Sequence, residues 1–148
     1  MKKFGSFLAL GMLLMIILSF LAVVMKSLFQ YNSNALQETI IYIHASIFML
    51  GIVYAFVHDK HVRIDIFYQK NSEFKKNKVN FYGTLLLLIP FFSFILFSSF
   101  TYVYASWSIL ESSSESGGLP FVYALKTFIL VIPALMLILA VIKLVRNR

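Results

Sequence analysis

The chain has 148 residues, of which 60% are hydrophobic and only 13% are charged, so it carries more apolar residues than a soluble domain of this size would bury. The formal net charge is +7, but the basic residues occupy the gaps between apolar runs rather than one solvated face, which argues against binding to nucleic acid. The absence of cysteine excludes disulfides, thiol chemistry and cysteine metal sites.

Four apolar runs are long enough to cross a membrane, because a helix needs about 20 predominantly apolar residues to span the hydrocarbon core. The runs are residues 4–25, 39–57, 81–106 and 120–142. The first follows Lys2 and Lys3, as in a secretory signal, but it is too long for one and no cleavage site follows it. The sequence therefore predicts an all-α fold, a four-helix bundle that forms a single integral membrane domain over residues 1–148.

Lysine and arginine residues are distributed unevenly between the two sides of these spans. Eleven of the thirteen lie at the N-terminus, between the second and third runs, or at the C-terminus, whereas only Lys26 and Lys126 lie toward the other side. Short loops rich in Lys and Arg stay in the cytoplasm. Both termini are therefore predicted to be cytoplasmic.

Four lysines lie where anionic lipid headgroups are expected. Lys75, Lys76 and Lys78 precede the third run, and Lys126 lies within two turns of the start of the fourth, where a long side chain reaches the interface. For the first three, an equally open interpretation is that they only fix the topology of the chain.

Polar residues and prolines mark the connections and the breaks. The Asn-Ser-Asn sequence at 32–34 predicts a turn that makes the first two spans an antiparallel hairpin. The Ser- and Gly-rich segment 112–118 is expected to be flexible, and Pro120 is expected in the first turn of the last helix. Pro90 and Pro133 lie inside the third and fourth runs, where each is expected to kink or loosen its helix.

Apolar and polar side chains alternate from His61 to Lys70, directly after the second run. This pattern favours a short amphipathic helix that lies along the membrane surface. The nearby acids and histidines are explained by ordinary solvation at the interface.

No arrangement of polar residues favours an enzyme, a metal site or a cofactor. His44 and His58 are fourteen residues apart, about 21 Å along a helix, and so cannot share one ion. Phosphate-binding glycine loops and nucleophile and base pairs of recognisable spacing are missing. Because no carboxylate lies deep within a run, the sequence also argues against autonomous proton-coupled export.

One face of the second run carries His44, Ile47, Gly51, Tyr54 and His58 at alternating spacings of three and four residues. The glycine lets another backbone approach closely, and the histidine and tyrosine can form hydrogen bonds across such a contact. The spacing does not separate two alternatives, packing within this chain and packing against another protein.

Two groups of residues carry a family resemblance over nearly the whole chain. The first is Glu38, Gly51, Tyr54-Ala55 and His61-Val62-Arg63-Ile64-Asp65, and the second is Trp107, Glu111, Gly118-Leu119-Pro120 and Ile132-Pro133. Together they resemble the small membrane subunit, the DctQ-like Q component, of tripartite ATP-independent periplasmic (TRAP) transporters.

The resemblance implies a symport system of three proteins, with this chain as a multi-pass protein of the bacterial inner membrane. In that family a periplasmic substrate-binding protein captures an organic anion, such as a C4-dicarboxylate or sialic acid. A large permease subunit then takes the anion up with sodium, while the small subunit braces the permease as a heterodimer. Substrate selectivity belongs to the other two proteins. A stand-alone four-helix exporter or scaffold protein is the alternative function.

The resemblance and the stripe together suggest roles for particular residues. The residues expected at the contact with the large subunit are Glu38, His44, Gly51, Tyr54, His61, Arg63 and Asp65. Glu111 and Glu115 are expected to help dock the binding protein through charge, with simple solvation of the loop as the alternative.

Overall fold

The computed structural model describes residues 2–58 and 73–146, and every regular element in these ranges is helical. The elements are α1 (Lys2–Phe29), α2 (Asn34–Val57), α4 (Glu73–Gly83), the π-helical turn η1 (Thr84–Leu88), α5 (Ile89–Ser108) and α6 (Val122–Arg146). Four stretches are long and apolar enough to cross a membrane, namely Phe4–Phe29, Asn34–Val57, Lys75–Ser108 and Val122–Val145. The prediction of an all-α membrane fold with four spans is confirmed. The predicted surface helix, with His61, Arg63 and Asp65, lies outside the described residues.

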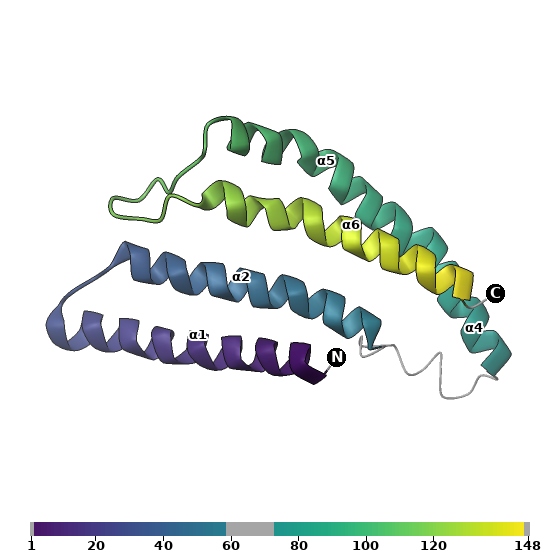
Figure 1. Cartoon of the computed structure of the whole chain (residues 1–148), viewed down its shortest axis with the longest axis horizontal. Helices are drawn as coiled ribbons and strands as arrows, with labels where there is room; N and C mark the ends of the chain where they lie inside the picture. The colour runs from purple at the N-terminus through teal and green to yellow at the C-terminus, as the bar shows by residue number, and fades with distance from the viewer. Residues whose placement is uncertain (1, 59–72, 147–148) are drawn as a thin grey trace.

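The spanning helices lie side by side in a row, in the order α1, α2, α6, α5 (Figure 1). α1 and α2 form one antiparallel hairpin, α5 and α6 form the other, and the two hairpins meet where α2 packs on α6. The connections 30–33 and 109–121 lie at one end of the helices, called here the loop end. Both chain termini and α4 lie at the opposite end of the helices, called here the terminus end. The bundle is thus an open layer, in which the two outer helices each have one packed neighbour.

The core of this layer lies at the junction of α2 and α6. Phe56, Ile132 and Met136 are buried there, surrounded by partly buried side chains from α2, η1, α5 and α6. The Lys143 ammonium lies 5.0 Å from the centre of the Phe56 ring and closes the core toward the terminus end. Because lipid tails are as apolar as these side chains, close van der Waals packing holds the hairpins together.

α2 begins at Asn34 rather than at the predicted residue 39, because Ser33 caps it. The Ser33 hydroxyl accepts a hydrogen bond from the backbone N–H of Leu36 at 3.3 Å, which satisfies a free donor of the first turn. Just before the cap, Gln30 adopts the left-handed conformation (φ 54°) that often ends a helix. Glu38 therefore lies inside the helix rather than in the loop that precedes it.

Each proline affects its helix differently. Pro90 lies two residues after the end of η1, where the N–H of Ile89 bonds to the carbonyl of Thr84, five residues back. A proline lacks an N–H and its ring collides with the carbonyl four residues earlier, so this widened turn accommodates Pro90. α6, in contrast, continues through Pro133. The prediction that Pro120 lies in the first turn of the last helix is wrong, because α6 begins at Val122.

Candidate functional site

The carboxylate of Glu38 ties the loop between α5 and α6 to α2. The Ser113 hydroxyl donates a hydrogen bond to one of its oxygens, and the Leu119 backbone N–H donates to the other at 2.5 Å. Hydrogen bonds to an ionised acceptor are stronger than neutral ones. Glu38, Ser113 and Leu119, called here the clasp, therefore join the two hairpins at the loop end, and Asn34 adds a bond from its side-chain amide to the Ser116 carbonyl at 3.0 Å.

The loop itself is folded rather than flexible, contrary to the expectation from its composition. The Ser113 N–H bonds to the Leu119 carbonyl at 3.1 Å, and the Gly118 N–H bonds to the Glu115 carbonyl at 3.0 Å. A Cβ atom on Gly118 would lie 2.6 Å from the Ser113 Cβ and 2.7 Å from a Glu38 carboxylate oxygen. The glycine is therefore needed for close packing of the loop against the clasp.

An ion pair lies beside the clasp. The Lys126 ammonium donates a hydrogen bond to the Glu111 carboxylate at 2.5 Å and lies 4.2 Å from the centre of the Tyr102 ring. This ammonium holds the pKa of Glu111 below its usual value. The structure thus gives Glu111 and Lys126 partners within the chain, whereas the Glu115 side chain is exposed on the loop.

Aromatic side chains strengthen the same end of the second hairpin. The Trp107 indole N–H donates to the Thr127 hydroxyl at 2.9 Å, and the Trp107 ring meets the Tyr123 ring edge-on at a centroid distance of 4.8 Å. Tryptophan and tyrosine favour the membrane interface because their rings are apolar and their tips polar. Sequence reasoning missed the roles of Ser113, Leu119 and Thr127, because no local spacing links residues so far apart in the chain.

A groove of about 390 Å³ runs between α1 and α2, at the stripe predicted from the spacing of α2. It is lined by Leu8, Met12, Met15, His44, Ile47, Phe48, Gly51, Ile52 and Ala55. The stripe divides into two sets of residues. Ile47 and Tyr54 pack on α1, where a Cβ on Gly11 would lie 2.8 Å from Ile47 Cδ1 and a Cβ on Gly5 would lie 2.8 Å from the Tyr54 hydroxyl.

The other set, His44 and Gly51, faces the open groove. A Cβ atom added to Gly51 would meet nothing within 4 Å. The His44 ring is exposed, and its Nδ1 lies 3.3 Å from the Met15 sulfur, a weak partner. His44 lies ten residues after the start of α2, about 15 Å along the helix, so this imidazole is near the middle of a span.

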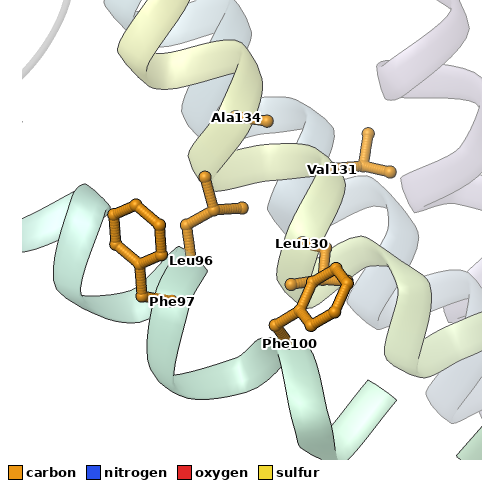
Figure 2. Close-up of a pocket in the computed structure, with 6 residues that line it drawn as sticks. All are labelled: Leu96, Phe97, Phe100, Leu130, Val131 and Ala134. Carbon is orange, nitrogen blue, oxygen red and sulfur yellow. The ribbon is translucent and has the colours of Figure 1, made fainter. Parts of the chain in front are cut away.

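A second groove, of about 420 Å³, lies between α5 and α6 and is shown in Figure 2. Its lining consists entirely of apolar side chains, namely Leu96, Phe97, Phe100, Leu130, Val131 and Ala134. Such a lining offers nothing to an ion or a polar substrate. In residues 2–58 and 73–146, no three His, Cys, Asp or Glu residues lie close enough to hold a metal ion.

Comparison with known proteins adds a family to this geometry. Residues 15–148 match the family model described as "Tripartite ATP-independent periplasmic transporters, DctQ component". No curated protein and no solved structure matches the chain. Because the match covers most of the sequence, the chain belongs to this family of small membrane subunits.

Proposed function

From this membership we infer that the chain braces the large permease subunit of a TRAP transporter during sodium-coupled uptake of an organic anion. The large subunit and a periplasmic substrate-binding protein are its partners in this proposal. A brace needs a surface on which another membrane protein can pack, whereas a transporter that acts alone needs a polar pathway. The α1–α2 groove provides such a surface. The groove of Figure 2 is wholly apolar and offers no polar pathway.

The observation that carries the proposal is the pair His44 and Gly51 in the α1–α2 groove. An exposed imidazole in the middle of a span is costly in contact with lipid tails. A neighbouring protein that supplies a hydrogen bond removes this cost, and a glycine without a neighbour allows its backbone to approach closely. The groove is also lined by Met12 and Met15, whose flexible side chains adapt to a partner surface.

The other residues expected at the two contacts enter the proposal differently. Tyr54 supports the groove from inside through its contact with Gly5, and Glu38 acts through the clasp rather than by direct contact. His61, Arg63 and Asp65 enter through the family resemblance. For docking of the binding protein, Glu115 is the stronger candidate, because the charge of Glu111 is already balanced by Lys126.

Co-purification tests the proposal. Gly51→Leu fills the groove, so we expect the amount of large subunit recovered with the tagged chain to fall at least about tenfold, whereas Ala134→Leu, which fills the groove of Figure 2, should leave recovery unchanged. Both variants should remain helical by circular dichroism. Normal recovery and uptake with Gly51→Leu would falsify the proposed interface, and wild-type protein that purifies as a stable lone bundle would favour a stand-alone role.

The proposed orientation places the loop end in the periplasm and both termini in the cytoplasm of a bacterial inner membrane. Because the chain has no cysteine, labelling of a single introduced cysteine shows on which side of the membrane that residue lies, without background labelling of this chain. Ser114→Cys should react with a membrane-impermeant maleimide in intact spheroplasts, and Asn77→Cys should react only after lysis. The opposite pattern would reverse the topology.

A further inference from the structure

A group of lysines and an apolar groove lie next to each other along the third spanning segment. α4 carries Lys75, Lys76 and Lys78, of which the first and third are exposed. Directly after α4, a groove of about 500 Å³ is lined by Gly83, Leu87, Leu88, Phe91 and Phe92. Charge and apolar volume thus follow one another along a single helical path.

The depth of these residues matches the layers of a bilayer. The apolar run of this segment begins near residue 81, and the lysines precede it by three to six residues, about 5–9 Å along a helix. The headgroup layer extends about 5–8 Å beyond each edge of the hydrocarbon core. The ammonium groups therefore lie at the level of lipid phosphates, and the groove lies at the level of the upper acyl chain.

The shape of the groove depends on Gly83 and on the π-helical turn. A Cβ atom on Gly83 would meet nothing within 4 Å, so the groove is open at its headgroup side. Lys76 lies seven residues before Gly83, which places both on the same face of the helix. Leu87 within the π turn and Phe91 after it, 73% and 58% exposed, continue the apolar surface from Gly83.

We propose that this surface binds one anionic phospholipid, with its phosphate among Lys75, Lys76 and Lys78 and one acyl chain in the groove from Gly83 to Phe92. Charge complementarity selects this occupant, since α4 holds three lysines against one glutamate. Lys143, near the end of α6, adds positive charge at the terminus end. The site does not depend on the role of the chain in transport.

Charge also separates this groove from the one in Figure 2. The nearest lysine in sequence to that second groove is Lys126, four residues before Leu130, and its ammonium is paired with Glu111. The second groove can hold an acyl chain of any lipid, but no group of lysines lies beside it to bind a phosphate. It therefore serves as a matched control for acyl packing without headgroup selection.

Native mass spectrometry of the full-length chain, released from mild detergent after incubation with phosphatidylglycerol or phosphatidylcholine, tests the proposal. The wild-type chain should retain phosphatidylglycerol preferentially. The triple variant K75Q/K76Q/K78Q should lower this preference about tenfold or more, whereas Lys26→Gln, at the loop end, should leave it unchanged. Raised ionic strength should weaken the preference of the wild-type chain.

A second arm tests the groove. Gly83→Leu fills it and should lower retention of phosphatidylglycerol, while Ala134→Leu should not; if Gly83→Leu does not fold, Phe91→Trp fills the groove from the other side. Millimolar glycerol phosphate should fail to displace the lipid, because it lacks an acyl chain. An unchanged preference in the triple variant, an equal loss in Lys26→Gln, or displacement by glycerol phosphate would each overturn the proposal. This experiment does not measure association with the large subunit. A negative result on lipid binding would therefore leave the proposed bracing role unaffected.

Discussion

Glu38 and Ser113 lie 75 residues apart in the chain, yet the Ser113 hydroxyl donates a hydrogen bond to the Glu38 carboxylate. This bond crosses from the first hairpin to the second, at the opposite end of the α2–α6 junction from the contact of Lys143 with Phe56. The two hairpins are therefore held at both ends, by hydrogen bonds at the loop end and by a cation–π contact at the terminus end.

Removal of the clasp should release the loop. Glu38→Ala eliminates both hydrogen-bond acceptors, so we expect cleavage by the protease Glu-C after Glu115 to accelerate about tenfold in the reconstituted chain, because local opening controls such cleavage. Mass spectrometry of the fragments identifies the site. Ser113→Ala should give a smaller effect, and the double variant should show less than the sum of both. An unaltered cleavage rate in Glu38→Ala would show that the clasp does not hold the loop.

The pair of Glu111 and Lys126 should make stability depend on pH. A carboxyl group whose pKa is lower in the folded than in the unfolded chain stabilises the fold above its unfolded pKa, and this contribution disappears as the pH falls through the folded value. The midpoint of thermal unfolding should therefore be constant above about pH 5.5 and fall as the pH drops below about 5. Lys126→Gln should remove this part of the pH dependence, whereas Lys26→Gln should retain it. Parallel curves for all three proteins would contradict the assignment.

Gly118 and Gly51 should respond oppositely to the same substitution. Gly118→Ala places a Cβ atom against Ser113 and Glu38, so we expect a lower unfolding midpoint and faster cleavage of the loop. Gly51→Ala adds its methyl group to open space and replaces glycine with a better helix former. Its unfolding midpoint should equal or exceed that of the wild-type chain. If Gly51→Ala lowered the unfolding midpoint, the added methyl group would have a close neighbour, and the groove would not be open in the membrane.

His44 should contribute to association through a hydrogen bond. His44→Phe keeps an aromatic ring in the groove but removes its polar atoms, and a hydrogen bond between membrane helices contributes about 1 kcal/mol. We therefore expect affinity for the large subunit, measured by fluorescence transfer in nanodiscs, to fall about fivefold. His44→Gln, which retains a donor and an acceptor, should restore much of it. Equal affinity for the phenylalanine variant would place His44 outside the contact.

Met136 should be among the most sensitive positions of the isolated chain. It is 2% exposed at the α2–α6 junction, and truncation of a buried methionine leaves a cavity that costs about 2 kcal/mol. Reversible unfolding of Met136→Ala in mixed micelles measures this loss. Phe97→Ala removes a larger side chain that is 78% exposed, and we expect it to change the free energy of unfolding much less.

The sequence predicted the helical spans because their signal is local. Runs such as 4–25 are predominantly apolar, and a membrane requires helices of that length. The predicted start of α2 at residue 39 is too late, because Asn34, Gln37 and Glu38 interrupt the apolar run, whereas the Ser33 cap starts the helix at Asn34. Composition alone therefore misplaces a helix end that extends into the interface.

The candidate sites depended on contacts that composition does not encode. The composition of the Ser- and Gly-rich loop predicts flexibility, because no local pattern indicates a hydrogen-bond partner in α2. In the structure, the Glu38 carboxylate accepts hydrogen bonds from this loop. The stripe of α2 was found by its spacing, but its division between packing on α1 and an open groove depends on Gly5 and Gly11 of another helix. Such pairings appear only when the order of helices in the row is known.

The row itself has a consequence for how this chain tolerates change. In a closed bundle most inward-facing side chains are buried, whereas here few side chains are buried among the described residues, among them Phe56, Ile132 and Met136. Most substitutions therefore change a side chain that faces lipid or a partner protein rather than the core of the chain. A mutational scan that measures folding of the isolated chain should find most substitutions tolerated. The same scan, when it measures assembly with the partner, should identify further sensitive positions on the faces of the layer.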